Sequence, residues 1–357
     1  MILEGYLQAA PKAELHIHLE GAIQPKTVLA LAQLNKITLP IKTVEELRQR
    51  FIYRDFDHFV ETFLMITSCL KTREDYEQIV YELGAEMARQ NVRYAEVTVT
   101  PSTHHLLGVS HDVYFAGMQQ GRARVYKDFN VEINWIFNIV RKWSDPTRTQ
   151  PMADYVTSVA IEGKNDGVVA LGLAGSEAGW PPEPFAPWFE RARNAGLHSA
   201  PHAGEMAGPK SIWGALSALG AERIAHGVRA IEDPKLVDYL AQHHIPLDIS
   251  PTSNIYLGVY PNYAAHPLRQ LYEAGIPITI STDDPPLFET TLNEEVLRLA
   301  TQFDLDIPAI DEILLNGIRY SFLTELRRQE LEEVFLAELA VAKTKYLTDG
   351  SNYNEQL

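Results

Sequence analysis

Two histidines near the N-terminus have the type and spacing of a metal-binding pair. In His16-Ile17-His18 the imidazoles lie two residues apart, so on a strand both point to the same side and can bind one ion. Alone, the pair is also typical of hydrogen-bonded surface or core histidines. His202 and Asp283 add an imidazole nitrogen and a carboxylate oxygen, groups that zinc prefers. The four residues together predict a site for one zinc ion per chain, with a position left open for water.

Two residues near these ligands could handle the protons of a hydrolytic reaction. Zinc lowers the pKa of a bound water from ~15.7 toward ~7, which gives hydroxide at neutral pH. Glu205 lies just beyond His202 in the chain and can reach a substrate atom beside the metal. His226 is not committed to the metal and can orient the hydroxide or stabilise its charge. We therefore expect Glu205 and His226 to be catalytic.

Two predicted strand ends carry residues that could contact a substrate. In Asp283-Asp284-Pro285-Pro286 we expect one aspartate to bind the metal and Asp284 to face the substrate, although such a turn can also cap a helix. Gly175 lies at the end of another strand, where glycine allows close backbone approach to a ligand; the alternative is a simple tight turn.

The remaining histidines have no strand-end carboxylate beside them in the sequence. We expect them to be solvated or locally hydrogen-bonded, and His58 and His198 receive no role. The solvated or locally bonded group comprises His104, His105, His111, His243, His244 and His266.

Short β-branched runs alternate with longer helical patterns, which predicts parallel strands joined by helices. Eight strand–helix units favour a closed (β/α)₈ TIM barrel, in which polar clusters at the strand ends meet at one mouth. The predicted strands are Glu14–Leu19, Arg93–Thr100, Glu132–Val140, Val168–Leu173, His198–His202, Arg223–His226, Pro246–Ser250 and Pro277–Thr282.

Helical patterns fill the segments between and after these strands. Arg73–Gln90 has the apolar spacing of a helix with one buried face. A long insertion after the first strand, from Gly21 to Thr72, includes the helical pattern Asp57–Leu70. The charged C-terminal segment Arg327–Tyr346 is expected to be an outer helix without chemistry. We expect a single α/β domain over residues 1–357.

Composition excludes several functional classes. A formal net charge of −16 argues against nucleic-acid binding, because phosphate neutralisation needs a basic face. One cysteine, Cys69, cannot form a disulfide within the chain, and we expect it to be buried in an amphipathic helix. The N-terminus lacks a signal-peptide pattern, and no apolar run reaches the ~18 residues of a membrane span. A cytoplasmic location is the default expectation, and the oligomeric state stays open.

Five motifs in one order resemble the adenosine deaminase family of the amidohydrolase superfamily. They are HIHLEG, HAGE, RIAHG, SPTSN and STDDP, and the resemblance extends from Pro11 to about Phe322. The resemblance implies that His16, His18, His202 and Asp283 bind zinc. It further implies that hydroxide adds to purine C6 and that ammonia leaves.

The resemblance also implies roles for the residues around the metal. Glu205 would give a proton to purine N1, and His226 would hold the attacking hydroxide. Asp284 would contact N7, and the Gly175 backbone would contact N3. An apolar lid would come from one face of the insertion, although core packing is the alternative reading there; its residues are Phe59, Val60 and Phe63.

The sequence departs from the family pattern at two positions. The family usually has aspartate after HxHL, where it meets the ribose 5′-hydroxyl, whereas this chain has Glu20. The usual AGDE is AGSE here, with Ser176. HLEG also occurs in adenine deaminases of the family, and the stretches Met87–Pro101 and Ser281–Glu295 resemble a bacterial branch with 6-aminodeoxyfutalosine deaminases. The leading expectation is deamination of adenosine or a 5′-modified adenosine. Deamination of adenine and of 6-aminodeoxyfutalosine are the alternatives.

Two further hypotheses assign the chain a function other than purine deamination. The same ligands could serve another amidohydrolase reaction, because fold does not fix function. Such sites often use two metals and a carboxylated lysine, and the strand end at Leu171–Ala174 has no lysine. A non-catalytic barrel that binds a purine or a partner protein is the third hypothesis, which an intact ligand set with Glu205 argues against.

Overall fold

The computed structural model describes residues 2–143 and 145–347. All of its strand pairs are parallel. The strands are β1 (Lys12–His18), β2 (Val92–Val99), β3 (Glu132–Val140), β4 (Val168–Ala174), β5 (His198–Ser199), β6 (His202–Ala203), β7 (Ile224–His226), β8 (Leu247–Ile249) and β9 (Ile278–Ile280).

The strands pair in chain order, β1 to β5 in one sheet and β6 to β9 in another. β5 and β6 are the two halves of one predicted strand, and Pro201 between them has no N–H to donate. Backbone bonds bridge this break, because Ala200 N donates to Leu171 O and Ala225 N donates to Pro201 O.

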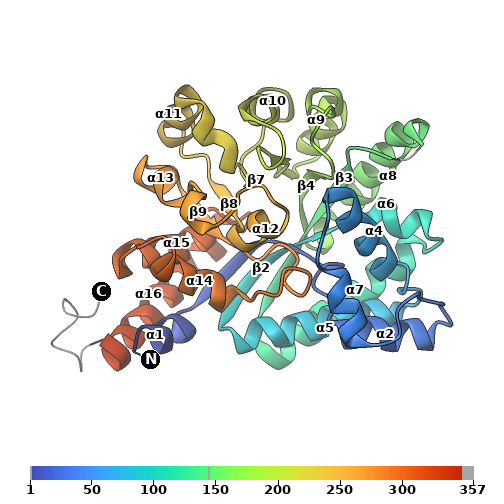
Figure 1. The fold of residues 1–357 in the computed structure, drawn as a ribbon, viewed down its shortest axis with the longest axis horizontal. Coiled ribbons are helices and arrows are strands. Elements are labelled where there is room, and N and C mark those ends of the chain that lie inside the picture. Colours follow the sequence, from blue (N-terminus) through green and yellow to red (C-terminus); the bar gives the residue numbers. More distant parts are fainter. Residues whose placement is uncertain (1, 144, 348–357) are drawn as a thin grey trace.

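The last strand also returns to the first. Just beyond β9, Asp283 N donates to His16 O (3.1 Å), and His18 N donates to Asp283 O (2.8 Å). The predicted (β/α)₈ TIM barrel is confirmed, with the strands at the centre of the molecule and helices around them (Figure 1).

Helices follow the strands and build the insertion and the C-terminal end. They are α1 (Ile2–Ala9), α2 (Pro25–Leu34), α3 (Val44–Arg50), α4 (Phe56–Thr67), α5 (Arg73–Arg89), α6 (Pro101–Leu106), α7 (His111–Phe129), α8 (Thr149–Glu162), α9 (Ala186–Asn194), α10 (Pro209–Leu219), α11 (Pro234–Gln242), α12 (Pro251–Tyr256), α13 (Leu268–Glu273), α14 (Leu292–Thr301), α15 (Ile307–Arg319) and α16 (Glu325–Leu347).

The sequence explains where several of these helices begin. Thr72 and Asp75 form a reciprocal capping box at the start of α5, which satisfies two backbone donors of its first turn. Asp55 caps α4 by accepting from His58 N (2.8 Å). α4 ends at Thr67, so Cys69 lies two residues beyond the helix in which it was expected, although it is buried as predicted. α16 packs against α1 and α15, as expected for an outer helix.

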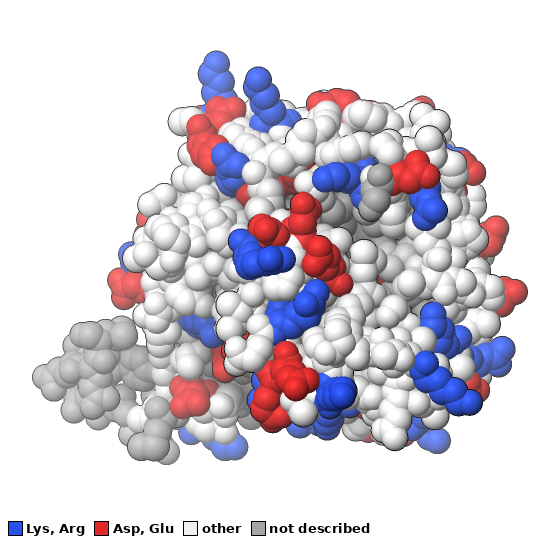
Figure 2. Space-filling view, turned by 45° about the vertical axis from the view of Figure 1, so that its right-hand side comes forward, with Lys and Arg blue, Asp and Glu red and all other residues white. Residues whose placement is uncertain are grey.

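On the face shown in Figure 2, Lys and Arg side chains are interspersed with Asp and Glu and form no continuous basic field. No helix in the described part of the chain is long and apolar enough to cross a membrane.

Candidate active site

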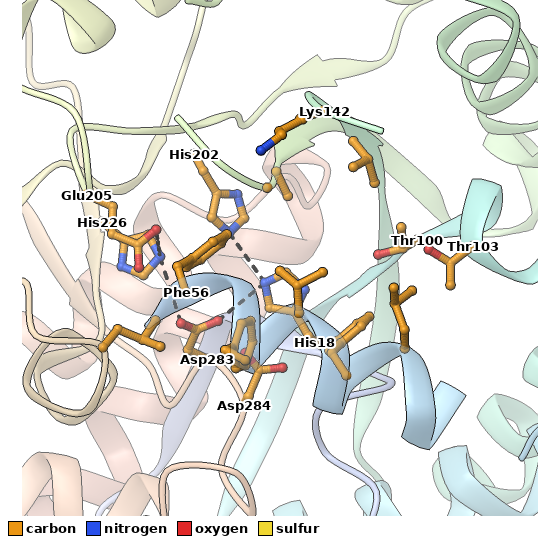
Figure 3. Close-up of a pocket in the computed structure, with 18 of the residues that line it drawn as sticks. His18, Phe56, Thr100, Thr103, Lys142, His202, Glu205, His226, Asp283 and Asp284 are labelled. Carbon is orange, nitrogen blue, oxygen red and sulfur yellow. Dashed lines mark hydrogen bonds and ion pairs between the residues drawn. The ribbon is translucent and has the colours of Figure 1, made fainter. Parts of the chain in front are cut away.

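The predicted polar clusters meet in one cavity at the carboxyl ends of the strands (Figure 3). The cavity has a volume of about 180 Å³. Its position is the one that barrel enzymes use, because the loops after the strands converge there. Its lining comprises His18, Phe56, Phe59, Val60, Phe63, Leu64, Thr100, Thr103, Val140, Lys142, Trp143, Ala174, Gly175, His202, Glu205, His226, Leu257, Asp283 and Asp284.

Three imidazoles and one carboxylate converge at the base of this cavity. His202 Nε2 lies 3.1 Å from His16 Nε2 and 3.3 Å from His18 Nε2. Asp283 Oδ1 lies 3.4 Å from His16 Nε2 and 3.3 Å from His18 Nε2. Four tetrahedral ligands at about 2.0–2.1 Å from a zinc ion lie roughly 3.3–3.4 Å from one another. These four spacings are close to that value, so this buried cluster can hold a metal ion.

His226 also lies near this group, and its distances separate it from the other histidines. Its ligand atom lies within 4.8 Å of those of His16, His202 and Asp283. Its Nε2, however, is 3.8 Å from Asp283 Oδ2 and 3.7 Å from Glu205 Oε2. His18 is outside the group that includes His226 and forms a second one with Asp283 and Asp284, so Asp283 is common to both groups.

The ionisation of the buried groups matches a metal site. Burial and the neighbouring imidazoles hold the pKa of His202 well below its usual range, so its ring is neutral and can act as a ligand. Burial acts to raise the pKa of Asp283, but the facing His16 and His226 outweigh it and hold this pKa well below its usual range. Asp283 is therefore an anion, and Ser253 Oγ donates to its Oδ2 (2.7 Å), which leaves Oδ1 for the metal.

A buried polar network below the site orients His16. Its Nδ1 lies 3.5 Å from the carbonyl oxygen of Asp248. The Asp248 carboxylate in turn accepts from Arg223 Nε (2.6 Å) and from Thr279 Oγ1 (2.6 Å). Arg223 also pairs with Glu96 at 2.5 Å. Such outer contacts fix the ring orientation of a ligand histidine.

A chain of hydrogen bonds assigns the proton of His226. Leu268 N donates to His266 Nδ1 (3.2 Å), so the proton of a neutral His266 is on Nε2, which donates to Asn254 Oδ1 (3.0 Å). The Asn254 amide then donates to His226 Nδ1 (3.2 Å). Burial lowers the pKa of both imidazoles to about 3, so both rings are neutral. His226 therefore carries its proton on Nε2, directed toward Glu205 and Asp283.

Glu205 is held in a form that can donate a proton. Burial, together with the charges of Asp283 and Glu177, raises the pKa of Glu205 well above its usual range. Its backbone is fixed by Glu177, whose Oε2 accepts from the N–H groups of Glu205 (2.9 Å), Met206 (2.7 Å) and Ala207 (2.9 Å). Glu177 Oε1 accepts from Gly204 N (2.9 Å) and Ser211 Oγ (2.6 Å).

The backbone at two polar residues is strained. His226 has φ +65° and Asp283 has φ +68°, a region that residues other than glycine rarely adopt. Each such residue costs on the order of 1–3 kcal/mol and persists only where its surroundings fix it. The ladder bonds of Asp283 and the Asn254 contact of His226 supply that fixation.

Helix α4 supplies an apolar wall opposite the polar base. Phe59, Val60 and Phe63 all line the cavity. Phe59 stacks on Phe288, with ring centroids 5.7 Å apart, and Phe63 lies edge-on to His18 at 6.5 Å. The residues predicted as a lid are therefore brought to the cavity, and they also pack against the core.

Gly175 and Asp284 line the cavity as expected for substrate contacts. Gly175 has φ +88°. Asp284 Oδ1 is buried without a hydrogen-bond partner among the described residues. A Cβ atom at Gly21 would lie 1.5 Å from this oxygen, so the close approach of the two requires glycine there.

Glu20 differs from its expected placement. It is absent from the cavity lining, because its Oε1 accepts from Thr100 N (2.8 Å) and pairs with His104 Nε2 (2.9 Å). The His104 Nδ1 atom meets Tyr76 Oη at 2.8 Å. The expectation that His104 is solvated or locally hydrogen-bonded is therefore wrong, because His104 is fully buried and contacts Glu20, which lies 84 positions away and two residues after β1. His266 likewise is buried and belongs to the His226 network.

Sequence reasoning missed several residues around the site. Glu177 stood in the AGSE motif and Ser253 and Asn254 in SPTSN, so their motifs were noticed without roles. Lys142 followed a predicted strand end without any motif.

Over residues 11–337 the sequence matches the adenosine deaminase family. The chain belongs to the adenosine deaminase family. It is 37% identical over 321 residues to the aminodeoxyfutalosine deaminase of Streptomyces coelicolor, covering 90% of this chain and 82% of that protein. It is 35% identical over 329 residues to the adenine deaminase of Albidiferax ferrireducens, covering 92% of this chain and 94% of that protein.

A solved member of the wider superfamily has the same fold. An amidohydrolase from Burkholderia ambifaria with bound zinc superposes with a TM-score of 0.86 at 25% identity, covering 97% of this chain and 94% of that chain. The predicted family, barrel fold and hydrolase class, acting on C–N bonds, are thereby confirmed for this adenosine deaminase family member.

Proposed function

We propose that this adenosine deaminase family member catalyses zinc-dependent hydrolytic deamination of adenosine or a 5′-modified adenosine, giving the 6-oxo purine and ammonia. The observation that carries the proposal is the convergence of His16, His18, His202 and Asp283 near Glu205, whose pKa is raised by burial. We also propose that the chain is one catalytic domain.

In this proposal one zinc ion is held by Nε2 of His16, His18 and His202 and by Oδ1 of Asp283. Zinc in such a site lowers the pKa of water from ~15.7 toward ~7. Three imidazoles and one carboxylate are a donor set that zinc prefers, and the four spacings between these atoms support it.

The residues of the cavity would then move protons and hold the purine. The His226 Nε2–H group would hold the attacking oxygen, and Glu205 would donate its proton to purine N1 as that oxygen adds to C6. The O–H proton of the adduct would pass through the Glu205 carboxylate to the amino group, and the C6–N bond would break, which releases ammonia and leaves a carbonyl at C6. Asp284 would contact N7, and the Gly175 backbone would contact N3, which keeps C6 at the polar end.

Two relatives support more specific alternatives. The 37% identity to an aminodeoxyfutalosine deaminase supports an adenosine extended at its 5′ end, and the 35% identity to an adenine deaminase supports the free base. Withdrawal of Glu20 from the cavity favours the extended nucleoside, because the carboxylate that would meet a 5′-hydroxyl is engaged with His104.

A substrate panel tests the proposal. We would measure kcat/KM for adenosine, deoxyadenosine, adenine, methylthioadenosine and aminodeoxyfutalosine, with the metal content of the same preparation. The proposal expects about one zinc per chain and turnover of a nucleoside above that of adenine. Metal-loaded protein that is inert on every 6-aminopurine would overturn it, and two zinc ions per chain would favour another amidohydrolase reaction.

A further inference from the structure

His202 lies at the seam between the two sheets of the barrel. Its strand, β6, pairs with β7 alone among the described strands, and the other sheet ends at β5. The N–H and C=O groups of successive residues in a strand point to opposite neighbouring strands. Ala203 O accepts from Gly227 N (3.0 Å) on the β7 side, so His202 O points to the other side, toward β4. On that side the described strands offer this carbonyl no ladder partner.

Arg141 holds this carbonyl in place of a strand. It follows β3 directly, is fully buried, and donates from Nη2 to His202 O (2.5 Å). Its Nη1 donates to Trp180 O (2.8 Å), in the loop that follows β4 and also contains Glu177. The guanidinium group is a rigid, planar fork of donors. It therefore fixes the His202 backbone relative to the ends of β3 and β4.

Packing alone does not account for an arginine at this position. Its Nε is buried without a hydrogen-bond partner among the described residues, which costs free energy. Burial lowers the pKa of Arg141 to about 10 against the opposing charges of Glu177 and Glu183, so the group stays charged at neutral pH. A well-packed apolar side chain often stabilises a fold as well as a buried charge does. What Arg141 supplies beyond packing is a fixed position for the His202 carbonyl.

We infer that Arg141 is a positioning residue for the proposed metal ligand His202, whose backbone it fixes at the seam of the barrel. The inference rests on the proposed zinc site and adds to it a residue outside the cavity lining. Any shift of the His202 backbone moves its Nε2, which now lies 3.1 Å from His16 Nε2 and 3.3 Å from His18 Nε2. Loss of the contacts that orient a ligand histidine lowers metal affinity about 10- to 100-fold.

The test measures zinc affinity in matched arginine variants. We would prepare metal-free wild type, Arg141→Met, Arg141→Lys and Arg122→Met, and determine the Kd for zinc by competition with a chromophoric chelator. Arg122, in α7, is the control because it also donates to a backbone oxygen, Asp166 O (2.9 Å), and lies outside the cavity lining. Denaturant unfolding of each metal-free protein reports stability separately.

Arg141→Met should raise the Kd for zinc about 10- to 100-fold, because the His202 carbonyl loses its fixed donor. Arg141→Lys should recover only part of this loss, since an ammonium group keeps the charge but lacks the planar fork. Arg122→Met should lower stability and leave the Kd unchanged. The visible spectrum of the cobalt(II)-loaded protein reports ligand geometry, so it should change in Arg141→Met and not in Arg122→Met. At saturating zinc, kcat should fall more than KM rises.

A wild-type Kd for zinc in Arg141→Met would overturn the inference and leave the proposed deamination intact. An equal rise of the Kd in Arg122→Met would also overturn it, because lost stability would then explain the effect. If Arg141→Met does not fold, Arg141→Lys decides, and a wild-type Kd and cobalt spectrum in that variant would contradict the positioning role. Wild-type protein that binds no zinc would overturn the proposed function together with the inference.

Discussion

Replacing Glu177 by glutamine tests how the catalytic loop is held in place. The Glu177 carboxylate accepts five hydrogen bonds, four from the backbone N–H groups of residues 204–207 and one from Ser211 Oγ. These N–H groups belong to the turn that carries Glu205. Glutamine has nearly the same shape but only one accepting oxygen. It therefore cannot accept both the hydrogen bonds that Oε1 accepts and those that Oε2 accepts.

The magnitude follows from the contacts that glutamine cannot make. With the amide oxygen placed at the Oε2 position, the amide nitrogen faces Gly204 N, and two donors are opposed. Ser211 can turn its hydroxyl to accept, so at least one buried N–H loses its partner. A hydrogen bond to a charged group contributes about 1.5–3 kcal/mol. We therefore expect Glu177→Gln to lower the free energy of unfolding by about 2 kcal/mol.

Activity should fall more than stability alone explains. A displacement of about 1 Å in a positioned group can cost on the order of 100-fold in rate, so a displaced Glu205 should lower kcat strongly. The assays are denaturant unfolding, kcat and metal content, with Glu190→Gln on the exposed surface of α9 as the control. Zinc content should be unchanged, since Glu177 touches none of the proposed ligands. Wild-type kcat and stability in Glu177→Gln would refute the reasoning.

Other substitutions test separate parts of the site. Glu205→Gln should keep the metal and lose turnover by orders of magnitude, and near-normal turnover would refute a proton donor. In the wild type, activity should be lost as pH rises through the raised pKa of Glu205, because only the protonated carboxyl donates; a flat alkaline limb would contradict this. Asn254→Asp should move the His226 proton to Nδ1, seen by ¹⁵N NMR, and lower kcat; an unmoved proton would refute the hydrogen-bond chain. Phe59→Ala should destabilise the fold by about 3 kcal/mol by removing the stack on Phe288, and raise KM more than it lowers kcat; unchanged KM would show that Phe59 serves packing alone.

The polar ends of the strands were predictable because strand periodicity and barrel topology act together. His16 and His18 point to one side of a strand, and parallel strands place their carboxyl ends at one mouth. Residue type and strand position were enough to predict that His16, His18, His202 and Asp283 lie close together. The strand containing His202 was also predicted. Its interruption at Pro201 was not predicted, although proline has no backbone N–H to donate.

Residues that act through contacts distant in sequence were not predictable. Glu20 and His104 are 84 positions apart, and their pairing depends on how α6 is placed relative to the residues that follow β1. The alignment of His266 with Asn254 and His226 depends on how the loop before α13 meets α12 and the end of β7. Glu177 meets a turn 27 to 30 positions away. Sequence periodicity records the face of an element but carries no information about such pairings between elements.

The central claim is tested most directly by running the reaction in ¹⁸O-water with metal-loaded protein and a 6-aminopurine nucleoside. The account predicts that the product is the 6-oxo purine carrying one ¹⁸O at C6, with ammonia released in equal amount, and that a chelator abolishes both. A product without label, or no conversion of any 6-aminopurine offered, would contradict it.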